Sequence, residues 1–219
     1  MKFNKTQLPD KILFNECEYI FLDFDGVIKD SIEVKSNAFF KLFEKFGHHI
    51  ASKVRNHHKN NGGLSRFEKL PIYLCWAGKE PTEKLISEYC IKFSKLVKKD
   101  VIESNWVPGV LDFIIENNKK SSFFLVTATP QDEIEEIMIE LNIMTYFVDV
   151  IGAPTKKIDA VKKILKQYSI SPNNSIMIGD SDADFYAAND NCVSFILRRT
   201  KYNKDLQKEL NCPKIYNFM

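Results

Sequence analysis

Two groups of aspartates in this chain follow short apolar runs. The first group is Asp23 and Asp25, and the second is Asp180, Asp182 and Asp184. Carboxylate oxygens suit Mg²⁺, which proteins usually hold with few carboxylates, together with waters and substrate phosphate. The two groups therefore predict a site of hard oxygen ligands that suits Mg²⁺. Asp182 is expected to be an exposed residue in the first turn of a helix, where the helix dipole favours acids.

A hydroxyl and an amine follow two further apolar runs. Thr127 ends the run at residues 123–127, and Lys156 and Lys157 come after the run at residues 148–151. In an open parallel sheet, ligands bind beyond the carboxyl ends of the strands. Four consecutive strands that end in acid, hydroxyl, amine and acid therefore predict one site with hard oxygen ligands and a fixed cation.

The elements that must position these side chains follow from the apolar pattern. Runs without polar alternation, rich in β-branched and aromatic residues, are typical of strands covered on both faces. Helical patterns lie between the last four runs, and this alternation predicts an α/β fold with a doubly wound parallel sheet. The predicted strands are residues 19–24, 123–127, 148–151, 175–178 and 193–197, and the predicted helices are residues 131–142, 157–168 and 182–189.

The interval between the first two runs is too long for a single crossover. Apolar residues recur there at helical spacing, first between residues 34 and 46 and again between residues 85 and 97. Pro108-Gly109 then marks the return to the sheet domain, followed by a short helix at residues 110–117. We expect a core made of residues 1–31 and 108–219, with a helical insertion of residues 32–107 over the end of the first strand.

Composition narrows the classes of function. The 219 residues are 44% hydrophobic and 27% charged, and 31 basic residues against 29 acids give a net charge of +2. This balance argues against a nucleic-acid binder. No apolar run is long enough to cross a membrane, and residues 1–16 lack a signal-peptide pattern, so we expect a cytoplasmic protein, monomeric or homodimeric. Five scattered cysteines without a CxxC pair favour reduced thiols over zinc or disulfides.

Three segments resemble the motifs of the haloacid-dehalogenase-like (HAD) hydrolase superfamily. Residues 21–31 (FLDFDGVIKDS) resemble motif I, residues 125–127 (LVT) motif II, and residues 179–184 (GDSDAD) the GDxxxD form of motif IV. Order and spacing match across almost the whole chain, and the insertion falls where the helical C1 cap of that family sits. The DGVxxDS pattern is most similar to the phosphoglycolate phosphatase and β-phosphoglucomutase branch. The resemblance implies a Rossmann-like core.

The resemblance also implies a role for each polar residue. Asp23 would be the nucleophile that forms an aspartyl-phosphate, and Asp25 the general acid and base. Asp180 would complete the Mg²⁺ ligands with Asp23 and the backbone carbonyl of Asp25. Asp184 would hold a water or the lysine from outside the metal's own ligands. Thr127 would donate a hydrogen bond to a phosphoryl oxygen.

The catalytic lysine is where the chain departs from the common Lys-Pro pattern of the family. Residues 152–157 read GAPTKK, so both Lys156 and Lys157 are candidates. Apolar residues continue at helical spacing after Lys157, which favours Lys157 as the residue that begins the helix and faces the site. Lys156 remains the alternative.

One segment of the predicted insertion is suited to substrate recognition. Residues 62–69 (GGLSRFEK) place two glycines before a serine, an arginine and a lysine, which predicts a turn that leads to anion-binding side chains. In C1-capped relatives a comparable loop reads the substrate, so Arg66 and Lys69 are expected to contact it. A solvated charge is the alternative for Arg66. His57 and His58 are expected at the surface.

These features predict a Mg²⁺-dependent phosphatase that hydrolyses a small phosphorylated metabolite through an aspartyl-phosphate, with sugar phosphates among the candidate substrates. A phosphomutase is the alternative within the enzyme class, because it uses the same residues and differs in how the cap excludes water. A non-catalytic binding protein on the same fold is the alternative from another class. That alternative predicts a missing nucleophile or metal acid, and neither is missing.

Overall fold

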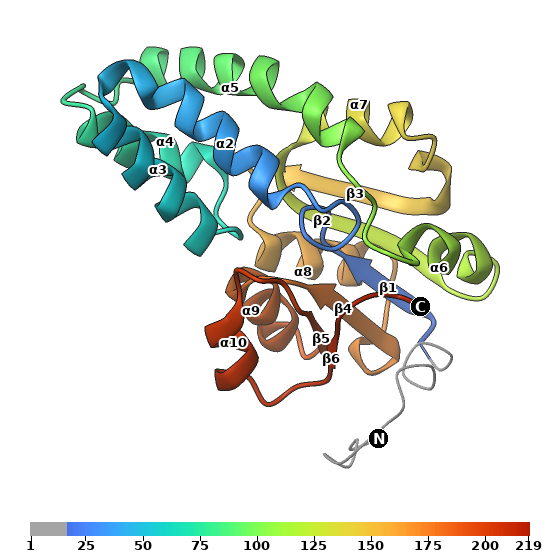
Figure 1. The fold of residues 1–219 in the computed structure, drawn as a ribbon. Helices are drawn as coiled ribbons and strands as arrows, with labels where there is room; N and C mark the ends of the chain where they lie inside the picture. Colours follow the sequence, from blue (N-terminus) through green and yellow to red (C-terminus); the bar gives the residue numbers. More distant parts are fainter. Residues whose placement is uncertain (1–16) are drawn as a thin grey trace.

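The computed structural model describes residues 17–219, so the expectation about a signal peptide in residues 1–16 lies outside the described residues. A six-stranded parallel sheet forms the centre of the fold, with strand order β3-β2-β1-β4-β5-β6 (Figure 1). The central strand β1 pairs with β2 on one side and with β4 on the other. The strands are β1 Tyr19–Leu22, β2 Ser122–Pro130, β3 Phe147–Ala153, β4 Ser175–Gly179, β5 Ser194–Arg198 and β6 Lys214–Ile215.

The five predicted strands are all present, with ends shifted by a few residues. β6 and the helix α10 (Lys204–Glu209) before it are not in the prediction. β6 has only two residues, and one of them is a lysine, so it carries almost no apolar signal. It forms because β5 offers a free edge to the returning chain.

Both faces of the sheet are covered by helices. The covering helices are α6 Val110–Asn117, α7 Gln131–Glu140, α8 Lys157–Gln167 and α9 Asp182–Asp190. Because side chains alternate along a strand, Ile20 and Leu22 face one side and pack in a core with α6 and α7, while Phe21 faces the other side and packs with α8 and α9. The α/β doubly wound architecture predicted from the apolar runs is confirmed.

The predicted insertion contains four α-helices, which we call the cap: α2 Ile32–Phe43, α3 His48–Asn60, α4 Arg66–Trp76 and α5 Glu83–Glu103. A 3₁₀ turn, Glu44–Phe46, joins α2 to α3. Figure 1 shows the cap gathered to one side of the sheet, beyond the arrowhead of β1. Aromatic side chains form its interior. Phe39 of α2 stacks on Phe93 of α5 with ring centroids 3.9 Å apart and meets Tyr73 of α4 edge-on.

None of the helices in the described part of the chain is both long and apolar enough to span a bilayer.

Candidate active site

Asp23 follows β1 directly and is almost completely buried. Its backbone N–H donates to the carbonyl of Ile178 at the end of β4, which extends the pairing of β1 with β4. One of its carboxylate oxygens accepts from the N–H of Phe24 at 2.7 Å. Gly26 then turns the chain with φ of +76°, and a Cβ there would lie 2.3 Å from a carboxylate oxygen of Asp180. Glycine is therefore required both for the turn and for the approach of Asp180.

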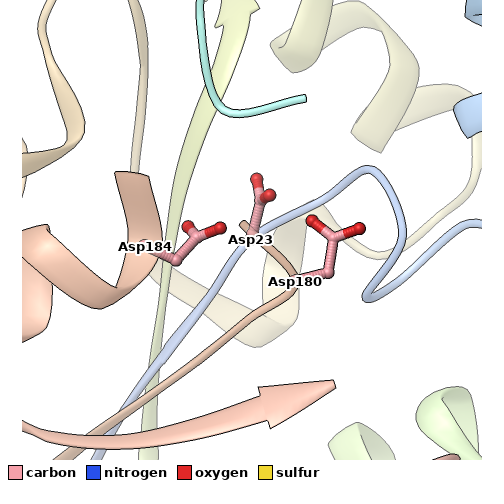
Figure 2. A group of neighbouring side chains, drawn as sticks. All are labelled: Asp23, Asp180 and Asp184. Carbon is pink, nitrogen blue, oxygen red and sulfur yellow. The ribbon is translucent and has the colours of Figure 1, made fainter. Parts of the chain in front are cut away.

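Three carboxylates converge at this point. Oxygens of Asp23, Asp180 and Asp184 all lie within 4.8 Å of one another. Figure 2 shows the side chains in a row, with Asp23 between the other two. Burial, followed by the nearby charge of Asp184, raises the pKa of Asp23 to about 7. Burial and the charge of Asp23 likewise raise the pKa of Asp180 well above its usual range.

The donor set fits a hard divalent cation. Within residues 17–219, no hydrogen-bond donor or ion-pair partner reaches the carboxylate of Asp180, although this side chain is about nine-tenths buried. A buried carboxylate without a partner is costly unless it binds a cation. Both oxygens of Asp184, in contrast, are already hydrogen-bonded. Asp180 is therefore the carboxylate best placed to bind a metal, and oxygen ligands suit Mg²⁺. Asp23 lies beside Asp180, with its own oxygens contacted by the N–H of Phe24 and by Lys157, and its role as a metal ligand stays a prediction.

Lys157 supplies the fixed cation of the site. It is the first residue of α8 and is 5% exposed, and its Nζ lies 2.7 Å from Asp23 Oδ2 and 2.7 Å from Asp184 Oδ1. Burial would lower the pKa of Lys157, but the charges of Asp184 and Asp23 outweigh burial and raise it. Lys156 is the residue before the helix and is exposed. Of the two candidates, Lys157 is the one beside the carboxylates.

Asp184 connects the lysine to the helix that follows β4. Its Oδ2 accepts from the N–H and the hydroxyl of Ser181, which forms a capping box at the start of α9, and its Oδ1 accepts from Lys157. Asp184 therefore orients Lys157, and its supporting role in catalysis stays a prediction. Asp182 is exposed and accepts from the neighbouring N–H of Ala183, as expected for a helix start.

Asp25 lies in a separate network that reaches into the cap. Its carboxylate pairs with Lys35 of α2, and it accepts from Ser31 Oγ at 2.5 Å and from Thr129 Oγ1 at 3.2 Å. Burial raises the pKa of Asp25, but the charge and hydrogen bonds of Lys35 and the two hydroxyls outweigh burial and lower it. Asp25 is therefore held as a carboxylate in this arrangement.

One residue of this network, Lys35, is absent from the sequence prediction. Lys35 Nζ also donates to Thr129 Oγ1 at 2.8 Å. The spacing of α2 could have identified Lys35. It follows Ile32 by three residues and precedes Phe39 by four, so its side chain lies on the buried face of the helix.

Thr127, the predicted phosphate-binding threonine, is buried, and its Oγ1 accepts from the N–H of Thr129 at 3.3 Å.

The cap loop reaches the core at a glycine. A Cβ on Gly63 would lie 2.4 Å from Cβ of Ala183 and 2.6 Å from Oγ of Ser181, so only glycine allows the loop to lie this close to the start of α9. The helix α4 begins directly after the loop with a capping box between Ser65 and Glu68. The contact of Gly63 and the capping box together place Arg66 and Lys69 on the side of α4 that faces Asp25 and Asp180 across a cavity.

The two predicted substrate residues differ in their partners. Arg66 is buried, and its guanidinium pairs with Glu133 of α7, so it is not a solvated charge. Lys69 is 1% exposed, and its Nζ lies 3.0 Å from Nδ1 of His58. The expectation that His58 lies at the surface is wrong, because its ring packs on Phe39 inside the cap. His57 is half-buried and contacts Tyr73.

A single cavity joins these groups. Its walls include Asp25, Asp180 and Thr129 from the core. From the cap they include four basic side chains: Lys35, His58, Arg66 and Lys69. The cavity therefore has the carboxylates of Asp25 and Asp180 on its core side and a cationic surface on its cap side.

The sequence of the chain is similar to those of known hydrolases. The family model described as haloacid dehalogenase-like hydrolase matches residues 19–197. Phosphoglycolate phosphatase from Vibrio vulnificus (strain YJ016) is 36% identical over 77 residues, which cover 32% of this chain and 34% of that protein. The match therefore spans about a third of the length of this curated relative.

Solved structures share the fold over nearly the whole chain. β-Phosphoglucomutase from Clostridium difficile superposes with a TM-score of 0.74 at 21% identity, covering 92% of each chain. CbbY from Rhodobacter sphaeroides, solved in complex with phosphate, has a TM-score of 0.74 at 16% identity and covers 92% of this chain and 95% of its own.

Proposed function

The chain belongs to the haloacid dehalogenase-like hydrolases, and on that premise we propose that it is a Mg²⁺-dependent phosphatase acting on a small phosphorylated metabolite. The observation that carries the proposal is the position of Asp23. It lies between a fixed lysine and the carboxylate of Asp180, which has no hydrogen-bond or ion-pair partner within residues 17–219. Lys157 Nζ is 2.7 Å from Asp23 on one side, and Asp180 is close on the other.

In this proposal Asp23 is the nucleophile. One carboxylate oxygen attacks the phosphorus atom, the bond to the ester oxygen breaks, and an aspartyl-phosphate forms on Asp23. Mg²⁺ bound by Asp23, Asp180 and the backbone carbonyl of Asp25 would offset the charge that otherwise repels a phosphate from three acids. Lys157 stabilises charge on the transferred group from the opposite side, while Asp184 holds the lysine in place. Thr127 is proposed to donate to a phosphoryl oxygen.

Asp25 is the general acid and base of this scheme. It donates a proton to the leaving oxygen, and in the second step it takes a proton from the water that attacks the aspartyl-phosphate and releases inorganic phosphate. Lys35 holds Asp25 in its ionised form, which is the form needed in the second step. Asp25 can donate a proton in the first step only if its contact with Lys35 loosens. The position of α2 in the cap therefore affects proton transfer by Asp25.

The proposal is tested by phosphate release from the purified protein. p-Nitrophenyl phosphate is assayed first with Mg²⁺, and then a panel of sugar phosphates and phosphoglycolate, with Asp23→Asn as the matched inactive control. Product analysis of sugar phosphates separates released phosphate from an isomerised sugar phosphate, which a mutase would produce. Release no faster than that of Asp23→Asn on every compound would refute the proposal.

A further inference from the structure

Two buried polar side chains at the end of β5 have no part in the proposed reaction. Arg198 is the last residue of β5 and is 8% exposed, and Asn203 precedes α10 and is 7% exposed. Arginine and asparagine are mostly exposed in proteins, and those that are buried have hydrogen-bond partners. The partners of these two side chains therefore show what they hold in place.

Asn203 holds the backbone of Asp180. Its Nδ2 donates to the backbone carbonyl of Asp180 at 2.7 Å and to that of Arg198 at 2.8 Å. Its Oδ1 accepts from the N–H of Thr200 at 2.9 Å and from Nε2 of Gln207 at 2.7 Å. Two donations and two acceptances use the full hydrogen-bonding capacity of a side-chain amide. The orientation of the Asn203 amide is therefore fixed.

Arg198 holds the turn that follows Asp25. Its Nη1 donates to the backbone carbonyl of Gly26 and its Nε to that of Tyr216, both at 3.2 Å. In residues 17–219 no carboxylate forms an ion pair with Arg198, so its buried guanidinium is used to bind backbone. The planar fork of donors in arginine is suited to joining two segments of chain in this way.

These contacts close a ring through three segments of the core. A Cβ on Gly26 would lie 2.3 Å from Oδ2 of Asp180, so the turn after β1 lies directly against that carboxylate. Asn203 joins the backbone of Asp180 to the carbonyl of Arg198, and the side chain of Arg198 returns to Gly26. The turn after β1 and the end of β4 are therefore both attached to the loop after β5.

We propose that Arg198 and Asn203 are positioning residues of the metal site. They fix the carboxylate of Asp180 relative to the backbone carbonyl of Asp25, so that both oxygens are arranged before the cation binds. Neither side chain is a ligand itself, because arginine has no acceptor atom and Oδ1 of Asn203 is engaged by other donors. This inference rests on the metal site of the proposed function and adds to it the residues that set its geometry.

Direct metal binding tests the inference. Mn²⁺ is titrated into the metal-free protein, and free Mn²⁺ is measured by electron paramagnetic resonance, with Asp180→Asn to identify the binding that belongs to this site. Asn203→Leu, Asn203→Ser and Arg198→Met should raise the Kd by roughly 10- to 100-fold, the usual effect of removing residues that orient metal ligands. Loss of the arginine charge would by itself favour cation binding, so weaker binding in Arg198→Met reports a change of geometry. Arg198→Lys should keep part of the affinity.

Two matched variants control for the loss of buried hydrogen bonds and of charge. Nδ2 of Asn191 also donates to two backbone carbonyls, those of Ile158 and Ala187, at the opposite end of α9 from the carboxylates. Nη1 of Arg199 donates to the hydroxyl of Tyr216. Asn191→Leu and Arg199→Met should therefore leave the Kd for Mn²⁺ unchanged. Circular dichroism and thermal unfolding establish that each variant is folded.

The outcome does not depend on turnover, which separates this inference from the proposed function. An unchanged Kd in the folded variants of Asn203 and Arg198 would overturn the inference and leave the phosphatase proposal intact. Equal losses of affinity in the control variants would overturn it as well. Absence of saturable Mn²⁺ binding to the unsubstituted protein would instead refute the metal site of the proposed function, and the inference with it.

Discussion

Arg66 of the cap and Glu133 of the core form a buried, bidentate ion pair. Nη1 of Arg66 lies 2.7 Å from Oε2 of Glu133, and Nη2 lies 2.5 Å from Oε1. Ser94 of α5 accepts from the same Nη1 at 2.6 Å. The pair therefore joins α4 and α5 of the cap to α7 of the core. The predicted contact of Arg66 with the substrate stays a prediction, because Glu133 occupies both terminal nitrogens of its guanidinium in this arrangement.

Removal of Glu133 should destabilise the protein strongly. Glu133→Ala leaves the charge of Arg66 buried and unpaired, which should lower the free energy of unfolding by about 3–5 kcal/mol. Glu136→Ala is the control, because Glu136 of the same helix α7 pairs with Lys98 of α5 at the exposed surface; this substitution should cost at most about 1 kcal/mol. Urea unfolding followed by circular dichroism measures both. Equal losses in the two variants would show that the buried pair does not contribute as inferred.

Asp23→Asn should abolish turnover without unfolding the protein, because an amide cannot form the acyl-phosphate. Asp25→Asn should slow turnover by roughly two to four orders of magnitude, which is the usual contribution of general acid and base catalysis. Steady-state kinetics on p-nitrophenyl phosphate measure both effects. A near-normal rate for Asp23→Asn would mean that another residue is the nucleophile.

Lys157→Ala should reduce kcat far more than Lys156→Ala. Nζ of Lys157 contacts two of the three clustered carboxylates, whereas Lys156 is exposed. The two variants are neighbours in the sequence and control for each other, provided that thermal unfolding shows both to be folded. The reverse ranking of kcat would transfer the catalytic role to Lys156.

Removal of divalent metal should eliminate activity, and Mg²⁺ should restore it. Without a cation, burial and mutual repulsion raise the pKa values of Asp23 and Asp180, and the cluster repels an anionic substrate. Activity is measured after dialysis against a chelator and again during titration with Mg²⁺, with Ca²⁺ for comparison. Full turnover in excess chelator would contradict the metal assignment.

Lys35→Met should shift the pH dependence of kcat upward. The charge and hydrogen bonds of Lys35 lower the pKa of Asp25, so their removal raises that pKa. The limb of the pH profile that arises from titration of Asp25 should therefore move to higher pH. The limbs that arise from other groups should not move. Lys41→Met, on the exposed side of α2, is the control. A profile that keeps its position in Lys35→Met would show that Lys35 does not set the protonation of Asp25.

The strand ends of the core could be read from the sequence because their information is local. Asp23, Asp180 and Thr127 each follow an apolar run, and parallel strands bring their carboxyl ends to one edge of the sheet. The start of α8 is local information as well, since apolar spacing predicts that the helix begins at Lys157. The catalytic role of Lys157 stays a prediction. β6 was not predicted, because a strand of two residues at the open edge of the sheet shows no apolar periodicity.

The cap required the folded chain, because its contacts join distant residues. Lys35 meets Thr129 across 94 positions, and Arg66 meets Glu133 across 67, and no spacing in the sequence encodes either pair. His58 and Lys69 both read as surface or substrate-facing charges, and only the packing of α3 against α4 buries them together. Sequence patterns report which residues share an element and which strand ends share an edge. The pairing of charges between separate elements depends on how those elements pack, and that packing is a property of the tertiary structure.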